Sequence, residues 1–401
     1  MKRLSKVAEG LIGQPMFKLM TKAKKIEQHT KVIHFEIGDP NFTSPSIAIN
    51  AAKTALDNGW THYTNSMGMI EFRETIAEIS KQKLGFKPII SQIVVTPANA
   101  AIDFVCRCVV DPGEEIIYPD PGFPTYFSVI NYNKFVPVPI QLKEKNNFRM
   151  NPEDIRKKIT SKTRLIIINT PHNPTGSVIT KDEILEIAQI AAEHDIYLLS
   201  DEVYTEIVYN SKHFSPSSTD LCKERTIVLN SLSKSYSMSG WRLGYIIGPE
   251  NVAEKIGLLV ETILSCIPPF IQIGGRAALL GNQEFLYKRN LILRKRRDLL
   301  INGLNKLSGI SCLTPEGSFY AFPNIKNTGM TCEKYSEKLL SETGVCVLPG
   351  NCFGPFGEGY LRLCYASTSE KTILEALGKM QMFHSKNIKK PLISKSSGEL
   401  V

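Results

Sequence analysis

The sequence predicts an α/β protein in which a large three-layer domain surrounds a mostly parallel sheet and a smaller α+β domain follows. Three observations support this prediction. Between about residues 90 and 250, short apolar runs alternate with segments of helical periodicity. These runs are almost continuously hydrophobic, as expected for strands that helices cover on both faces. The chain has 401 residues, which exceeds the usual size of a single hydrophobic core.

Six apolar runs are the predicted strands of the large sheet, and helices fill the intervals between them. Thr180-Lys181-Asp182-Glu183 has the pattern of a capping box, which opens a helix that we expect to end near His194. Strands that alternate with helices are typical of an α/β domain. The runs are Ile93–Val95, Glu115–Tyr118, Leu165–Ile168, Ile196–Leu199, Ile227–Leu229 and Tyr245–Ile247.

Pro268-Pro269 interrupts this alternation and marks the approach to the smaller domain. Helices are predicted from about residue 271, from 283 to 307, and from near residues 331 and 368. Short strands are predicted at residues 319–322, 345–348 and 361–363. The predicted division is an N-terminal segment of residues 1–45 that joins the small domain, a large domain of residues 46–280, a small domain of residues 281–385 and a flexible lysine- and serine-rich tail of residues 386–401.

The charge and the cysteine pattern exclude some kinds of partner and some cellular settings. The net charge of +9 is spread along the chain and forms no arginine-rich arm, so nucleic acid is not an expected partner. The nine cysteines follow neither a disulfide-scaffold spacing nor a zinc-site spacing, which favours a reducing, cytoplasmic setting without a bound metal. The N-terminus lacks the apolar core of a signal peptide, and no apolar run is long enough to span a membrane.

The segment after the run Ile227–Leu229 carries the strongest functional signal. It contains Ser231, Ser233 and Lys234, and Arg242 follows eight residues after the lysine. A lysine amine forms a Schiff base with an aldehyde, whereas an arginine and hydroxyl groups bind a phosphate. Pyridoxal phosphate carries both groups, so this segment is predicted to bind it. Taken alone, the segment fits an exposed basic turn equally well.

Asp201 and Tyr204 follow the buried run Ile196–Leu199. A carboxylate at such a strand end can pair with the protonated pyridine nitrogen of the cofactor, which lets the ring accept electrons from a substrate carbanion. The Tyr204 hydroxyl could donate a hydrogen bond to the phenolic oxygen of the same ring. An acidic helix N-cap is the competing interpretation of Asp201.

Asn173 lies in Asn169-Thr170-Pro171-His172-Asn173-Pro174-Thr175-Gly176, directly after the run Leu165–Ile168. Two prolines restrict this turn, so its asparagine amide is held at the edge of the sheet, within reach of the phenolic oxygen. A simple turn would have the same sequence. We expect His172 to be an exposed loop residue rather than a catalyst.

Two further segments follow predicted strands. Ala98, Asn99 and Ala100 open a helical pattern after Ile93–Val95, and a helix N-terminus offers backbone N–H groups to a phosphate. Phe123 follows Glu115–Tyr118 and could stack on a flat heteroaromatic ring, although a core aromatic residue would fit the same pattern.

Arg362 lies on the short apolar run Leu361–Leu363. A buried arginine needs an anionic partner, and its planar guanidinium can hold a carboxylate by two parallel hydrogen bonds. A substrate α-carboxylate would satisfy it. An internal ion pair is the competing interpretation.

The order Asn-Pro-x-Gly, Asp-x-x-Tyr, Ser-x-Ser-Lys with a downstream arginine, and a late arginine on a strand resembles the class I/II aminotransferases, which are fold type I pyridoxal-phosphate enzymes. The resemblance covers about residues 30 to 385. It implies that Lys234 is the Schiff-base lysine, that Asp201 holds the pyridine nitrogen, and that Phe123 stacks on the ring. Asn173 and Tyr204 would hold the phenolic oxygen, and Ser231, Ser233, Arg242 and the N–H groups of Ala98, Asn99 and Ala100 would bind the phosphate.

The resemblance also implies the substrates and the oligomer. Arg362 and Asn173 match the residues that bind the substrate carboxylate, and Gly38 matches the turn that lines the substrate site. Tyr63 matches the tyrosine that reaches the neighbouring subunit's phosphate, which implies a homodimer. One departure concerns the phosphate-binding turn, where relatives usually carry glycine or serine and this chain has Ala98-Asn99-Ala100. The backbone donors survive this change.

The expected activity is therefore transfer of an amino group between an α-amino acid and a 2-oxo acid. A carbon–sulfur β-lyase of the same family is the alternative, because it would use the same cofactor residues. A non-catalytic sensor, in which this domain is fused to a DNA-binding module, is disfavoured. Only a few dozen residues precede the matched region, too few for a winged helix, and both Lys234 and Arg362 are present. An acyl-transferring relative is disfavoured because those enzymes usually stack histidine where this chain has Phe123. Pro15, Met16 and Phe17 favour an apolar lid over the substrate.

Overall fold

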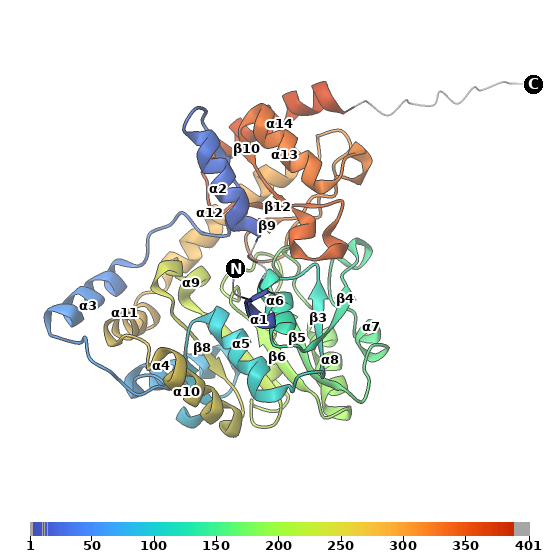
Figure 1. Ribbon diagram of the computed structural model, residues 1–401. Helices are drawn as coiled ribbons and strands as arrows, with labels where there is room; N and C mark the ends of the chain where they lie inside the picture. The colour runs from blue at the N-terminus through green and yellow to red at the C-terminus, as the bar shows by residue number, and fades with distance from the viewer. Residues whose placement is uncertain (1–2, 10, 12, 14, 389–401) are drawn as a thin grey trace, which may run out of the picture.

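The large unit is built on a seven-stranded sheet. The computed structural model describes residues 3–9, 11, 13 and 15–388, and its strand order is β2-β8-β7-β6-β5-β3-β4 (Figure 1). Strand β8 runs antiparallel to both of its neighbours, and the other pairs are parallel. The predicted α/β class is therefore confirmed.

All six predicted runs form strands of this sheet. The seventh, β4, has the sequence Val-Pro-Val-Pro-Ile-Gln and lies at one edge. Pro137 and Pro139 cannot donate ladder hydrogen bonds, which suits an edge strand and hides the segment from a search for continuous apolar runs. The strands are β2 (Ile93–Val95), β3 (Glu115–Asp120), β4 (Val136–Gln141), β5 (Thr163–Asn169), β6 (Tyr197–Asp201), β7 (Thr226–Ser231) and β8 (Gly244–Ile247).

Helices cover both faces of the sheet, because consecutive strand residues point to opposite sides. On β5, Ile167 packs in a core with α5 (Ala98–Val109), α6 (Pro124–Tyr132) and α10 (Glu250–Leu264), whereas its neighbour Ile166 packs in a core with α7 and α8 on the other face. A third core joins Val228 and Ile247 to α4 and α11. The remaining helices of this unit are α3 (Ser46–Asp57), α4 (Ile70–Leu84), α7 (Pro152–Arg156), α8 (Lys181–Glu193), α9 (Leu232–Ser235) and α11 (Pro269–Leu280).

The predicted capping box is confirmed at the start of α8. The Thr180 hydroxyl accepts a hydrogen bond from the Glu183 N–H, and the Glu183 carboxylate accepts one from the Thr180 N–H. These contacts satisfy two of the N–H groups that a helix leaves without partners at its start.

A second unit packs beside the large sheet. It contains the three-stranded sheet β11-β12-β9 and the parallel pair β1–β10, which joins the N-terminal segment to residues more than 300 positions later. One apolar core links β1, β9, β10 and β12 to α12, α13 and α14. The elements are α2 (Pro15–Glu27), β1 (Ile33–His34), α12 (Glu284–Leu304), β9 (Tyr320–Ala321), α13 (Cys332–Thr343), β10 (Val345–Cys346), β11 (Leu348–Pro349), β12 (Leu361–Cys364) and α14 (Glu370–Asn387), and the short helix α1 (Lys6–Glu9) precedes them in the chain.

Most of the predicted tail lies outside the described residues, since these end at residue 388 and α14 extends to Asn387. Among the helices of the described ranges, none combines the length and the apolar character needed to cross a bilayer.

Candidate active site

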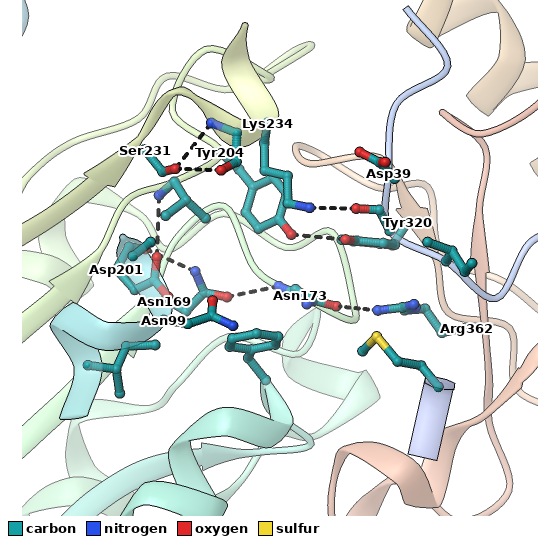
Figure 2. A pocket seen from close by; sticks show the side chains of 18 of the residues that line it. Asp39, Asn99, Asn169, Asn173, Asp201, Tyr204, Ser231, Lys234, Tyr320 and Arg362 are labelled. Carbon is teal, nitrogen blue, oxygen red and sulfur yellow. Dashed lines mark hydrogen bonds between the residues drawn. The ribbon is translucent and has the colours of Figure 1, made fainter. Parts of the chain in front are cut away.

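A cavity of about 220 Å³ lies at the carboxyl ends of β5, β6 and β7, the position at which α/β sheets usually bind ligands (Figure 2). The second unit closes it from the opposite side with Tyr320 and Arg362 (Figure 2). Twelve of the fourteen predicted site residues line it: Gly38, Ala98, Asn99, Phe123, Asn173, Asp201, Tyr204, Ser231, Ser233, Lys234, Arg242 and Arg362.

Lys234 extends from α9 into this cavity. Its amine donates a hydrogen bond of 2.5 Å to the Gly38 carbonyl. Burial lowers the pKa of Lys234 below its ordinary value, because the charged form loses hydration. Gly38 is confined on its other side, since an added Cβ would lie 2.1 Å from the Tyr320 hydroxyl oxygen. A glycine is therefore required where this backbone approaches the lysine.

Asp201 is buried at the end of β6, and its carboxylate accepts a hydrogen bond of 2.5 Å from the Tyr126 hydroxyl. Its backbone carbonyl accepts a bond of 2.9 Å from the Asn169 side chain at the end of β5, so the two strand ends are locked together. Burial raises the pKa of Asp201 to about 6, and the Tyr126 hydrogen bond opposes that rise. Sequence reasoning missed Tyr126, which lies 75 residues away in the chain.

Tyr126→Phe is expected to raise the pKa of Asp201 further, because the carboxylate loses a donor that favours its charged form. One hydrogen bond to a charged group corresponds to about one to two pH units. The affinity for pyridoxal phosphate should therefore fall at a pH that is higher by this amount than in the wild-type protein. Titrating cofactor binding at several pH values checks this. Tyr132→Phe is the matched control, since the Tyr132 hydroxyl binds Asp103, outside the cavity. Identical pH profiles for wild type and Tyr126→Phe would refute this coupling.

Arg362 is almost fully buried on β12. Its Nη1 donates to Asn173 Oδ1 at 3.2 Å, and its Nη2 donates to the Glu36 carbonyl at 2.5 Å. The guanidinium carbon lies 4.6 Å from the Tyr320 ring centroid and 4.8 Å from that of Phe353. Within the described part of the chain, Arg362 Nε has no hydrogen-bond partner, and the two partners of its other nitrogens are uncharged oxygens rather than carboxylates. The internal ion pair considered for Arg362 is thus not formed.

Two tyrosines meet between the units. The Tyr204 and Tyr320 hydroxyls share a hydrogen bond of 2.9 Å, so the large sheet and β9 are connected inside the cavity (Figure 2). Burial raises the pKa of both phenols, which remain neutral hydrogen-bond donors at physiological pH. Phe123 lines the same cavity and packs edge-on against Tyr126, with ring centroids 5.8 Å apart.

The opposite end of the cavity carries hydroxyl groups and a helix N-terminus. Ser231 Oγ donates to Ser233 Oγ at 2.9 Å. Helix α5 begins at Ala98, and Pro97 before it forms no side-chain cap. Gly244 keeps this region open, since a Cβ there would lie 2.8 Å from the Asn230 carbonyl oxygen and 3.3 Å from the Ala98 nitrogen.

Arg242 adopts a left-handed backbone conformation with φ 56° and is exposed at this end. Its guanidinium Nη1 donates to the Ser239 carbonyl at 2.7 Å. A guanidinium, two hydroxyl groups and a helix N-terminus thus line this end of the cavity, and groups of these kinds bind anions.

Two predicted residues do not line the cavity. Ala100 lies in the first turn of α5, one residue beyond Asn99, and Tyr63 lies in the loop between α3 and α4 with 85% of its surface exposed. His172, expected in an exposed loop, is buried beneath Thr175, with its Nδ1 2.8 Å from the threonine hydroxyl oxygen. That expectation was wrong, because the turn that contains His172 is covered by the segment around Ser318.

Several cavity residues were not predicted as site residues. Asn169 carried a signal, since it pairs with Asp201 across the ends of neighbouring strands. No local pattern indicated that Tyr320 or Asp39 would line the cavity, because they reach it from the second unit and from the N-terminal segment. Ile37, Ile102 and Val203 also line the cavity, as do Met16 and Phe17, which were expected to form an apolar lid.

These residues fit pyridoxal phosphate. An amine, a buried carboxylate and an anion site face one cavity, and Arg362 retains an unsatisfied N–H beside it. Pyridoxal phosphate carries an aldehyde, a ring nitrogen and a phosphate, which are groups that an amine, a carboxylate and an anion site can bind.

Comparison with known proteins agrees with this chemistry. Residues 30–380 match the family Aminotransferase class I and II. An aspartate aminotransferase from Pyrococcus horikoshii is 37% identical over 90% of this chain and 92% of its own length. Aromatic-amino-acid aminotransferase 2 from Thermococcus litoralis is 38% identical over 87% of this chain and 91% of its own length. The structure of the Thermus thermophilus aspartate aminotransferase with maleate superposes with a TM-score of 0.91 at 31% identity, covering 95% of this chain and all of that one.

The match extends over nearly the whole chain in sequence and in fold, and the relatives share the amino-group transfer that their names state. The chain therefore belongs to the class I and II aminotransferases, pyridoxal-phosphate enzymes that transfer an amino group between an α-amino acid and a 2-oxo acid.

Proposed function

We propose that Lys234 is the catalytic lysine of this aminotransferase and that Arg362 binds the substrate α-carboxylate. The observation that carries this proposal is the arrangement of both cations around one segment. The Lys234 amine donates a hydrogen bond to the Gly38 carbonyl, and the Arg362 guanidinium donates one to the Glu36 carbonyl. The two acceptors are only two positions apart in the chain. An amino acid whose carboxylate binds Arg362 then presents its α-carbon toward Lys234.

The remaining cavity residues bind the cofactor in this proposal. When bound, pyridoxal phosphate supplies an aldehyde for amines and a ring that accepts electrons from the substrate α-carbon. Asp201 is placed for the ring nitrogen, Asn173 and Tyr204 for the phenolic oxygen, and Phe123 for the ring face. The phosphate site comprises Ser231, Ser233, Arg242 and the N–H groups of Ala98, Asn99 and Ala100.

The lowered pKa of Lys234 supports its role as a base. Burial leaves a larger fraction of the amine uncharged at neutral pH, so that it can accept the α-proton of the substrate. The Gly38 carbonyl orients the amine, and Arg362 with Asn173 orients the substrate. This is general base catalysis between positioned groups. No described residue favours the β-lyase alternative, and the compared relatives are named aminotransferases.

We also propose a cytoplasmic homodimer in which Tyr63 reaches the phosphate site of the partner subunit. Tyr63 is too exposed to serve its own cavity and does not line it. The elements around it carry further exposed apolar side chains, as a surface covered by another subunit would. These are Ile47, Leu56, Trp60, Ile70 and Leu280. The absence of disulfides among the nine cysteines supports a reducing compartment.

Hybrid dimers test this arrangement. Tyr63→Phe and Lys234→Ala subunits, co-expressed with different tags, are purified as the mixed species. If Tyr63 acts across the interface, the subunit with an intact Lys234 receives an intact Tyr63 from its partner, and the hybrid has close to half of the wild-type turnover per dimer. If Tyr63 acts in its own subunit, no intact site forms, and the hybrid is no faster than the Tyr63→Phe protein. The latter result, or a monomeric active enzyme, would refute the proposed dimer.

The domain boundaries remain a proposal: residues 1–45 with residues 281–385, and residues 46–280. The β1–β10 pairing and the shared core of α12, α13 and α14 support this grouping.

A further inference from the structure

His34 lies between two carboxylates that belong to different elements. Its Nδ1 is 2.7 Å from Glu36 Oε1, and its Nε2 is 3.4 Å from Glu27 Oε1. Glu36 is fully buried, and its second oxygen accepts no hydrogen bond from the described residues. In the same part of the chain, His34 is the one cation within ion-pair distance of Glu36. A buried carboxylate without a cationic partner is strongly unfavourable, so the pair favours protonated His34.

We call the contacts of His34 with Glu27 and Glu36 the His34 bridge. Its Glu36 end is connected to the active site through the main chain. The Glu36 carbonyl accepts the hydrogen bond from Arg362 Nη2, and the Gly38 carbonyl accepts the one from Lys234. The position of the Glu36 backbone thus affects the guanidinium proposed to bind substrate. His34 holds the side chain of the residue whose carbonyl orients Arg362.

The other end reaches the cavity through α2. Glu27 is the last residue of this helix, whereas Met16 and Phe17 near its start line the cavity. In the described residues, α2 contributes one fully buried side chain, Ala23, to a small apolar core. Figure 1 shows α2 within the second unit, away from the large sheet. Leu19 and Ile26 pack against the same core, and Lys22 pairs with Glu337 at 2.9 Å. The contact between Glu27 and His34 adds a polar attachment at the C-terminal end of the helix.

We infer that protonated His34 is a positioning residue that ties α2 to the Glu36 segment and so holds Met16 and Phe17 over the substrate while Arg362 stays oriented. The inference rests on the proposed role of Arg362 as the carboxylate site. His34 does not touch the substrate in this account. It acts on substrate affinity through two elements that do.

The charges around His34 set the direction of its pH dependence. Glu27 faces it from α2, Glu36 from its own segment, and Cys346 lies opposite it on β10. Burial and Glu36 raise the pKa of the Cys346 thiol, which stays uncharged. Ser367 adds an uncharged hydroxyl, which donates to the His34 carbonyl.

The hydrogen bond to Glu36 raises the pKa of His34 above its ordinary value, and Glu27 adds to this rise, although burial opposes it. Because the folded pKa is the higher one, the bridge is complete below the ordinary histidine pKa of about 6.5. It is lost as the pH rises through the folded pKa.

His34→Gln tests the inference, because glutamine keeps a hydrogen bond to Glu36 but carries no charge. The KM for the amino donor should be about two- to fivefold higher in the variant at about pH 6, the range for a partly exposed ion pair. This ratio should fall toward one as the pH rises and wild-type His34 loses its proton. The kcat should stay within about twofold of wild type, since Lys234 and its surroundings are unchanged. His29→Gln is the matched control, since His29 is exposed in the turn after α2.

Amide hydrogen exchange of residues 18–27, measured without substrate, provides a readout independent of activity. At about pH 6, exchange should be faster in His34→Gln than in wild type, and the difference should disappear at alkaline pH. Glu27→Gln removes only the partly exposed ion pair between Glu27 and His34. It should also speed amide exchange in α2, even if His34→Gln folds poorly. Equal α2 exchange in all three proteins would overturn the bridge itself. Faster exchange with an unchanged KM would overturn its connection to substrate binding through Arg362.

Discussion

Lys234→Ala is expected to lower the rate of amino-group transfer by about 10⁴-fold or more, because both a positioned base and the amine that holds the cofactor are removed. The protein should also lose the visible absorbance that the lysine-bound cofactor gives. The variant should fold normally, since the substitution removes one polar side chain at the cavity wall together with its hydrogen bond to the Gly38 carbonyl. Steady-state assays with an amino donor and a 2-oxo acid, together with an absorbance spectrum, measure both effects.

Added small primary amines should restore part of the activity if the missing group is a base. Lys255→Ala is the control, since Lys255 is exposed on α10 and should show wild-type kinetics. A Lys234→Ala protein with wild-type turnover would remove the basis for the proposed mechanism.

Arg362→Lys is expected to raise the KM for α-amino acids by about 10- to 100-fold, because a lysine cannot form two parallel hydrogen bonds to a carboxylate. It would also lose the stacking on Tyr320 and Phe353 that holds the guanidinium flat. The affinity for pyridoxal phosphate should change little, since the anion site at Ser231 and Ser233 lies at the other end of the cavity.

The control uses a substrate that lacks the carboxylate. For a primary amine without this group, wild type and Arg362→Lys should be almost equally slow, because neither can use the Arg362 interaction. Arg296→Lys is the matched protein control, since Arg296 is also buried in the second unit but does not line the cavity. A KM for α-amino acids that is unchanged in Arg362→Lys would place the carboxylate site elsewhere.

The fold was predictable where local sequence and burial agree. The six apolar runs of the large sheet and the capping box at Thr180 are properties of short segments, and each one is observed. The edge strand β4 was not predicted, because Pro137 and Pro139 interrupt the apolar run. The β1–β10 pairing depends on residues far apart in the chain, and no local pattern indicates that Ile33 pairs with Val345.

The residues of the candidate site also fall into a predictable and an unpredictable group. Residues at strand ends, such as Asp201 and Asn173, were predictable because neighbouring parallel strands end at one edge of the sheet. Tyr126, Tyr320 and the His34 bridge were not, since each depends on how separate elements pack. His172 shows the opposite error: a polar residue in a turn is expected at the surface, yet the second unit covers it. The proposed contact of Tyr63 with a partner subunit depends on two chains, so the sequence of one chain does not determine it.

Reductive trapping identifies the lysine that binds the cofactor. The purified protein is incubated with pyridoxal phosphate, treated with borohydride and digested, and the modified peptide is sequenced by mass spectrometry. We expect a single stable phosphopyridoxyl group on the ε-amine of Lys234, with near-complete occupancy and no labelling of that peptide in Lys234→Ala. An unmodified protein, or a label distributed among surface lysines, would contradict this expectation.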